Sequence, residues 1–292
     1  MIKVFEAFAG YGSQHLAFKR LKADFEIVGI SEIDKYAIKA YEALHGTLPT
    51  NYGDISKIDW AEVPDFDLFT YSFPCQAISI VGQRQGLDEG SGTESSLLWE
   101  CKKAIEIKKP KILLMENVKN LVGRKNKPNF DKWLQYLESL GYTNYWKVIN
   151  AKNCGIPQNR ERVFCFSFLD GRDYTFPDGT QMKSLEDLGI PTPIYHFAFG
   201  EKRIYNEYCP TLARATGGGH IPSVLNRQLT PYECGLLMGL TPKESERLCA
   251  SGLSKTRLYN CLGNSIVVDV LVMLFKPIVK SEVEQCLTGP NA

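Results

Sequence analysis

The sequence lacks the features of several large protein classes. Its nine cysteines show no CxxC or CxxH spacing, which argues against a zinc site, and their odd number argues against a disulfide framework. No apolar run approaches the roughly 20 residues that span a bilayer. The first residues enter a strand-like run and do not resemble a signal peptide. We therefore expect a protein of the reducing cytosol, with no metal and no membrane segment.

An excess of charge of one sign is also missing, because the formal net charge of the 292 residues is +1. A nucleic-acid-binding protein is usually more basic, but the distribution of charge matters more than its sum. Residues 101–132 carry ten lysines and arginines against three acids. Such a stretch is either a solvated helix face or a rim that contacts phosphates, and the sequence leaves both open.

Apolar runs alternate with amphipathic stretches in the first 169 residues. Strands are expected at 4–8, 25–30, 66–72, 111–115, 145–149 and 163–168, helices from about 13 and at 34–44, 96–107 and 131–140, and a short third unit at Asp54-Ile55. This alternation predicts an α/β fold, with a doubly wound and mostly parallel sheet joined by crossover helices.

The pattern changes after residue 169. Residues 170–225 are rich in Gly, Pro, Tyr and Thr and read as a small strand-and-loop lobe. Helical periodicity returns at 230–238, with Thr230 as the expected N-cap and Pro231 at the first helical position, and again at 266–279. We predict a catalytic domain at 1–169, a lobe at 170–225, and a return segment at 226–292 that completes the first domain.

A glycine turn follows the first predicted strand. Gly10 and Gly12 would let the backbone approach a ligand at a helix N-terminus. The dinucleotide fingerprint requires a third glycine, but His15 stands there, so a nicotinamide or flavin cofactor is disfavoured. Glu32 ends the second strand, where an acid accepts hydrogen bonds from ribose, and Asp54 follows the third unit. Together they predict an adenosine pocket without a diphosphate clamp.

Two further side chains are expected at the carboxyl edge of the sheet. Cys75 follows the apolar run 66–73, where a buried strand opens into a glycine-rich loop; most cysteines are small core residues, but a thiolate here would be a strong nucleophile. Glu116 ends the apolar run 112–115, and desolvation there should raise its pKa. Neighbouring strands would bring both to one crevice.

Arg160 and Arg162 stand two residues apart, on one face of an entering strand. Guanidiniums in that position could orient a carbonyl group and hold nearby carboxylates. A surface ion pair is the alternative for Arg160.

Six motifs occur in a characteristic order along essentially the whole chain. They are Phe8-Ala9-Gly10-x-Gly12, Pro74-Cys75-Gln76, Glu116-Asn117-Val118, Gln158-x-Arg160-x-Arg162, Arg227-x-Leu229-Thr230-Pro231-x-Glu233-Cys234 and Gly263-Asn264-Ser265. In this order they resemble the motifs of the DNA (cytosine-5) methyltransferase family. The resemblance implies the methyltransferase variant of the α/β fold, with the lobe as its target-recognition region.

The resemblance also implies S-adenosylmethionine as the cofactor. The implied contacts are Phe8, Gly10, Tyr11 and Gly12, then Glu32 at the ribose, Asp54 at the adenine, Leu97 and Asn264 near the amino-acid end, and Ile33, Ile55, Pro74 and Ser265 beside them. The chain departs from the family at three positions: Glu6 replaces a commoner Asp, Ser13 replaces a common Gly, and Ile33 stands where a larger aromatic often covers adenine. These departures bear on cofactor affinity more than on the reaction.

The implied reaction fits the residue chemistry. Cys75 would add to C6 of cytosine, Glu116 would hydrogen-bond or protonate N3, and Arg160 would bind O2, with Arg162 completing the set. The target base must leave the duplex to reach them. The implied nucleic-acid contacts are Ser79, Val81, Gln83 and Arg84 in the loop after Cys75, together with Thr211 and Arg227 in or near the lobe. Val81, Gln83 or Arg84 would fill the vacated base position.

Three alternatives remain on the sequence alone. RNA cytosine methylation, on transfer RNA, uses the same scaffold and the same Cys, Glu and Arg set. A non-catalytic DNA-binding relative usually loses the nucleophile or the cofactor motif, whereas Cys75, Glu116 and Asn264 are all present. A dehydrogenase fails on the missing third glycine. We expect a monomer that acts on duplex DNA in the cytoplasm of a bacterial or phage-infected cell; the target sequence is left open.

Overall fold

A six-stranded sheet forms the centre of the structure. The computed structural model describes residues 1–74, 97–198, 201–215 and 221–288. The strands lie in the order β2-β1-β3-β4-β7-β5. Their bounds are β1 (Ile2–Ala7), β2 (Phe25–Ser31), β3 (Leu68–Tyr71), β4 (Ile112–Val118), β5 (Thr143–Asn150) and β7 (Glu161–Phe168). Neighbours from β2 to β4 pair in parallel, and β7 runs antiparallel between β4 and β5. The predicted mostly parallel α/β sheet is confirmed.

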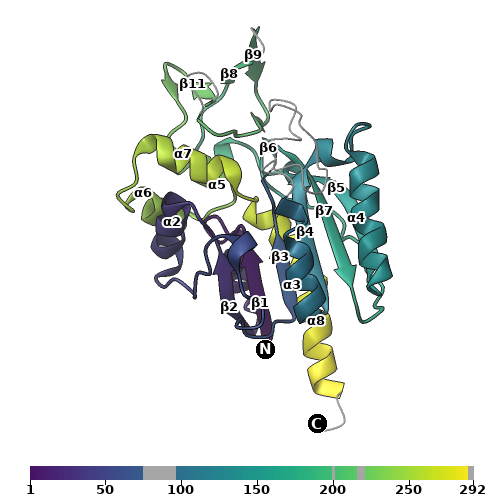
Figure 1. Cartoon of the computed structure of the whole chain (residues 1–292). Helices are drawn as coiled ribbons and strands as arrows, with labels where there is room; N and C mark the ends of the chain where they lie inside the picture. Colours follow the sequence, from purple (N-terminus) through teal and green to yellow (C-terminus); the bar gives the residue numbers. More distant parts are fainter. Residues whose placement is uncertain (75–96, 199–200, 216–220, 289–292) are drawn as a thin grey trace.

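Both faces of the sheet are covered, which explains why its central strands read as continuous apolar runs. In β4, Leu113 and Met115 pack with the core that contains α3 (Cys101–Lys108) and α4 (Lys127–Ser139). Ile112 and Leu114 alternate to the opposite face, with α1 (Ser13–Leu21) and α8 (Val268–Thr288). Figure 1 shows α3 and α8 on opposite sides of the sheet.

The remaining helices follow the expected periodicity. They are α2 (Lys35–His45), α5 (Pro231–Leu237), α6 (Pro242–Cys249) and α7 (Lys255–Asn264). Thr230 caps α5 as predicted, in a capping box with Glu233. Helix α4 begins four residues before the predicted start, because Pro128 fits its first turn and does not stop it.

The short third unit predicted at Asp54-Ile55 is not a strand. Asp54 and Ile55 lie at a short 3-10 helix, Ile55–Lys57, with Asp54 as its N-cap. On the outer side of β2, which is an edge strand of the sheet, the described chain adds one isolated parallel bridge, between Ile30 and Asn51. A tight turn at Gly53, whose φ is 70°, leaves no length for a strand.

A second, four-stranded sheet lies beyond the carboxyl edge of the first, at the top of Figure 1. It has the order β12-β11-β8-β9 and pairs β8 (Ile194–Ala198), β9 (Glu201–Tyr205), β11 (Ser223–Val224) and β12 (Arg227–Gln228) antiparallel. Tyr174, Leu185 and Ile190, which precede this sheet, are buried in the core shared with α8. The exact bounds of the three predicted segments stay a prediction.

Helix α8 packs back against the first domain. Phe275 stacks on Phe18 of α1 at 4.4 Å between ring centroids, and Arg20 pairs with Glu244 at 2.7 Å and Asp269 at 3.2 Å. Within the described chain, one helical stretch, residues 255–280, is long and apolar enough to cross a membrane, and 56% of its most apolar window is buried in the protein. Its apolar composition is that of a core helix.

Candidate functional site

The turn after β1 has an unusual backbone. Phe8, Gly10 and Gly12 all have positive φ values, of 56°, 58° and 77°. Position 12 requires glycine, because a Cβ there would lie 2.5 Å from Cε2 of Tyr41 and 2.6 Å from Nε2 of His45. Phe8 is a non-glycine residue in the left-handed region, which costs about 1–3 kcal/mol and is typical of functional sites. This turn directly precedes α1, which begins at Ser13 with Gly12 as its N-cap.

Glu32 lies beside this turn. One carboxylate oxygen accepts the N–H of Gly10 at 2.9 Å, and the other accepts the N–H groups of Ile33 and Asp34, both at 2.8 Å. Burial raises the pKa of Glu32, although the three N–H donors oppose this rise. A carboxylate has about four acceptor positions, so one remains on Oε2. The glycine turn and the expected ribose acid therefore meet in one place.

The Asp54 turn is held against the end of β2. Ser31 donates its hydroxyl to the carbonyl of Gly53 at 2.7 Å, and the N–H of Glu32 donates to Oδ1 of Asn51 at 3.1 Å. Hydrogen bonds from Ser56 lower the pKa of Asp54, whose side chain is well exposed. Ile55 is buried, while Ile33 is 74% exposed. Of the expected adenine contacts, Ile33 thus presents an open apolar surface.

The segment 263–265 returns to the glycine turn. A Cβ on Gly10 would lie 3.6 Å from Oγ of Ser265, so these segments are in contact. The Ser265 hydroxyl is buried and donates to the carbonyl of Cys261 at 2.8 Å. The side chain of Asn264 is exposed, and Leu97 is half-buried at the start of the described chain after residue 96.

Glu116 and Arg162 form a buried pair at the carboxyl edge of β4. Nε of Arg162 lies 3.3 Å from Oε1 of Glu116, and the two side chains are only 16% and 10% exposed. Burial raises the pKa of Glu116, as expected from the sequence, and the charges of Arg162 and Arg160 and the Ser72 hydroxyl only partly oppose it. This pair can hold or deliver a proton next to a fixed positive charge.

Asn117 fixes the chain that leads toward Cys75. Its side-chain amide donates to the carbonyl of Phe73 at 2.9 Å, and Tyr71 pairs with Met115 in the parallel β3–β4 register. The described chain stops at Pro74, one residue before Cys75. The expected residues Cys75, Ser79, Val81, Gln83 and Arg84 lie outside the described residues.

The role expected for Arg160 does not fit its surroundings. Its guanidinium is 3% exposed and donates to three main-chain carbonyls, those of Leu212 at 2.7 Å and of Gly263 and Ser265 at 2.8 Å each. Its charge still lowers the pKa of Glu116, but both of its terminal nitrogens are engaged by main-chain carbonyls. Arg162 is the arginine beside that carboxyl group, because the two side chains leave adjacent antiparallel strands.

The two expected lobe contacts are both engaged within the chain. The Thr211 hydroxyl donates to the carbonyl of Asn159 at 2.5 Å. Arg227 forms a bidentate pair with Glu233, with both distances 2.7 Å. Their contacts with nucleic acid stay a prediction.

The basic stretch 101–132 does not act as one positive face. Five of its lysines pair with acids: Lys103 with Glu100, Lys108 with Asp65, Lys111 with Asp67, Lys119 with Glu161 and Lys127 with Asp131. Four of these acids lie outside the stretch. A count of charges within residues 101–132 alone therefore overestimates its positive electrostatic potential.

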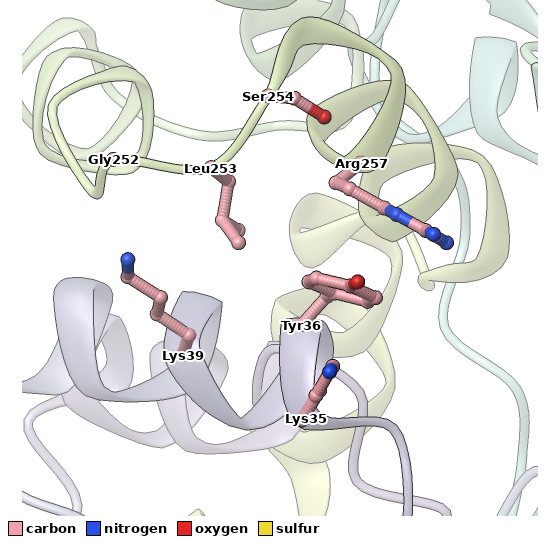
Figure 2. A pocket seen from close by; sticks show the side chains of 7 residues that line it. All are labelled: Lys35, Tyr36, Lys39, Gly252, Leu253, Ser254 and Arg257. Carbon is pink, nitrogen blue, oxygen red and sulfur yellow. The ribbon is translucent and has the colours of Figure 1, made fainter.

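A cavity of about 400 Å³ lies elsewhere, between α2 and the start of α7. Figure 2 shows Leu253 pointing into it above the ring of Tyr36, with Lys39 on one side and Arg257 on the other. The Arg257 guanidinium lies 4.0 Å from the centre of the Tyr36 ring. None of the residues expected at the site lines this cavity. In the described part of the chain, no three His, Cys, Asp or Glu side chains gather as metal ligands.

Two groups of positioning residues were missed from the sequence. Gln158 is fully buried and uses its amide to join Leu212 to the carbonyl of Leu237. Beneath the glycine turn, Tyr41 donates to Glu6 at 3.1 Å, and His15 lies 2.9 Å from the same hydroxyl. Burial raises the pKa of Glu6 to about 8. Gln158 stood inside a motif, but its partners are distant main-chain atoms that no spacing shows.

This fold and geometry define an α/β protein whose mostly parallel sheet carries a buried Glu116–Arg162 pair and a glycine turn at its carboxyl edge. The model of the family described as C-5 cytosine-specific DNA methylase matches residues 2–208. The chain belongs to this family and is a DNA cytosine-5 methyltransferase.

Known relatives cover nearly the whole chain. It is 40% identical to the type II methyltransferase M2.ScrFI of Lactococcus lactis subsp. cremoris, over 97% of this chain and 100% of that protein. It is 39% identical to M.NlaX of Neisseria lactamica, over 93% and 94% of the two chains. It is 30% identical to M.HhaI of Haemophilus parahaemolyticus, over 92% of each.

Solved structures share the fold. The Dnmt2 methyltransferase of S. pombe has a TM-score of 0.75 at 22% identity, covering 97% of this chain and 99% of that one. A putative DNA modification methyltransferase encoded within an E. coli prophage has a TM-score of 0.72 at 16% identity, covering 96% and 99%. The dehydrogenase alternative is excluded by the family.

Proposed function

We propose that this enzyme methylates C5 of cytosine in a short duplex DNA sequence through a covalent bond between Cys75 and C6 of a flipped-out base, with S-adenosylmethionine as methyl donor. One observation carries the proposal. The buried Glu116–Arg162 pair lies next to Asn117, whose side chain is hydrogen-bonded to the main-chain segment that leads through Pro74 to Cys75. A base in this crevice would meet an acid and a cation together.

The cofactor would lie along the glycine turn. The remaining acceptor position of Glu32 suits a ribose hydroxyl, the turn with positive φ values at residues 8–12 would let a ligand approach the main chain, and the open Ile33 side chain suits one face of adenine. Asp54, Ile55, Pro74 and Leu97 would complete the adenosine end, with Asn264 and Ser265 at the amino-acid end. When bound, S-adenosylmethionine supplies an electrophilic methyl group.

The residues of the chain would activate the base. The Cys75 thiolate forms a C–S bond at C6, and the electron pair of the C5–C6 double bond moves into the ring while Glu116 delivers a proton to N3. Arg162, not Arg160, would bind O2 and stabilise the charge that develops there. C5 would then accept the methyl group, with S-adenosylhomocysteine as the leaving product. Loss of the C5 proton to a base would restore the C5–C6 double bond and expel the Cys75 thiolate, and N3 would return its proton to Glu116. The raised pKa of Glu116 supports its part as proton donor.

The base reaches these groups only outside the helix. Ser79, Val81, Gln83 and Arg84 would contact the opened duplex, and Thr211 and Arg227 would contact its backbone from the lobe side. The β8–β9 and β11–β12 strands offer a compact reading surface, which fits a short target sequence.

The relatives named type II methyltransferases support a role in restriction–modification. A monomer in the bacterial or phage-infected cytoplasm stays our prediction.

Two assays test this function. Purified protein is incubated with methyl-labelled S-adenosylmethionine and either duplex DNA or transfer RNA, and bisulfite sequencing of DNA from expressing cells then maps the modified cytosines. We expect label in DNA at one short sequence, and none with a Cys75→Ala variant that still binds the cofactor. Label only in transfer RNA, or retained turnover by the variant, would overturn the proposal.

A further inference from the structure

The segment 209–215, which connects β9 to β11 within the lobe, is fixed to the segment before β7. Strand β10 (Cys209–Pro210) pairs in parallel with β6 (Gln158–Asn159), and the N–H of Cys209 donates to the carbonyl of Pro157 at 2.8 Å. The N–H of Leu212 then donates to Oε1 of Gln158 at 3.1 Å. This part of the lobe is therefore tied to the chain that enters the strand of Arg162.

The next residues are fixed to α7. The N–H of Ala215 donates to Oδ1 of Asn260 at 2.9 Å. A Cβ on Gly263 would lie 2.6 Å from the carbonyl carbon and oxygen of Ala213 and 2.8 Å from the nitrogen of Arg214. Backbone cannot yield as a flexible side chain does, so the contact between these two segments requires glycine at 263.

One guanidinium joins these segments. Nη1 of Arg160 donates to the carbonyl of Leu212 in segment 209–215, and Nη2 donates to the carbonyls of Gly263 and Ser265. The main-chain carbonyls on either side of Asn264 are therefore held by the same nitrogen. Ser265 in turn lies beside Gly10 of the cofactor turn, since a Cβ on Gly10 would be 3.6 Å from its Oγ. A shift of segment 209–215 must move Arg160, and with it the peptide groups around Asn264.

We propose that Arg160 is a positioning residue that couples the DNA-reading lobe to the cofactor site, so that target DNA and cofactor strengthen each other's binding. The inference rests on the proposed function, since it takes residues 263–265 as part of the cofactor site. Its physical basis is the shape of the donor. A guanidinium serves three carbonyls from two separated nitrogens in one plane, while a lysine ammonium donates from a single point and cannot keep that geometry. Coupling between two ligands is reciprocal, so it can be measured from the cofactor side.

The experiment measures the Kd of S-adenosylhomocysteine by calorimetry, with and without a duplex oligonucleotide that carries the site mapped by bisulfite sequencing. The wild type should bind it about 5- to 150-fold more tightly with the duplex present. In Arg160→Lys this ratio should fall to within about twofold of one. Arg20→Lys is the matched control, because Arg20 is a half-buried arginine that joins three helices and pairs with neither segment 209–215 nor residues 263–265. It should keep the wild-type ratio.

A second variant tests the inference even if Arg160→Lys does not fold. Asn260→Ala removes only the acceptor for Ala215 and leaves the guanidinium in place, so it should fold and lose part of the ratio. If Arg160→Lys weakens the binding of S-adenosylhomocysteine by the same factor with and without the duplex, the ratio is unchanged, Arg160 is merely structural, and the inference is overturned. A wild-type ratio of one with normal methyl transfer would also overturn it, while leaving the proposed function intact. Absence of methyl transfer in the wild type would instead refute the proposed function.

Discussion

Replacement of Glu116 by Gln tests the proton transfer proposed for this residue, because it removes the acidic proton while preserving the shape of the side chain. Glu116 is buried and lies 3.3 Å from Nε of Arg162, so the amide fits the same space and its oxygen can still accept. What it cannot do is transfer a proton to N3. A general acid contributes about 10²- to 10⁴-fold to a rate, which corresponds to about 3–5 kcal/mol in the barrier. We expect kcat to fall by that factor.

The pH dependence sharpens this prediction. Because burial raises the pKa of Glu116, the carboxyl group stays protonated in the folded protein above its ordinary titration range. The wild-type rate should decline as pH rises through that raised pKa, and Glu116→Gln should lose this decline. The raised pKa also gives a contribution to folding stability that is present at low pH and lost as pH rises through the folded value.

The stability cost should be small enough for the assay. Breaking a buried ion pair costs about 3–5 kcal/mol, but Arg162 also donates to the carbonyl of Glu161 and keeps the amide oxygen as a partner. We expect about 1.5–3 kcal/mol, as for a lost charge-assisted hydrogen bond. Glu161→Gln is the matched control, since Glu161 pairs with Lys119 in an exposed position. Single-turnover kinetics measure both variants. A kcat for Glu116→Gln within about threefold of wild type would refute the reasoning, because a general acid contributes far more.

Three further predictions test other parts of the site. Gly12→Ala should weaken cofactor binding at least about tenfold by calorimetry, because the Cβ would meet Tyr41 and His45 at a φ of 77°; unchanged affinity would contradict it. Arg162→Lys should lower kcat about 10²- to 10³-fold with the cofactor KM nearly unchanged, and a rise in KM alone would assign Arg162 to cofactor binding. Glu6→Gln should flatten the pH dependence of Tm. Burial raises the pKa of Glu6 from 4.5 to about 8, so its contribution to wild-type stability is full below about 4.5 and is lost by about 8. Parallel melting curves for both proteins across this range would refute that assignment.

Features that depend on local pattern could be predicted from the sequence. The apolar runs before Pro74 and Glu116 are long and continuous, so strands β3 and β4 and their shared edge follow from the residues alone. Glu32 and the glycine turn were found for the same reason, since both follow a strand directly.

Features that depend on distant partners could not be inferred. Arg160 and Arg162 look equivalent two residues apart, and only the position of residues 212 and 263–265, distant in sequence, separates their roles. β7 lies antiparallel between β4 and β5, and an apolar run does not show the direction or the order of a strand in the sheet. The short unit predicted at Asp54-Ile55 is a 3-10 helix, and the residues before it, Thr50-Asn51-Tyr52-Gly53, hold no apolar run that would indicate a strand.

The bond between the Cys75 sulfur and C6 of a cytosine is central to the proposed mechanism, and a trapping experiment measures it directly. Duplex DNA carrying 5-fluorocytosine at the mapped site is incubated with the enzyme and S-adenosylmethionine, because fluorine cannot leave C5 as a proton does. We predict a protein–DNA adduct stable to denaturing electrophoresis, with mass spectrometry of its peptides locating the link at Cys75. Efficient methylation of the unfluorinated duplex together with no adduct, or an adduct at another residue, would contradict this mechanism.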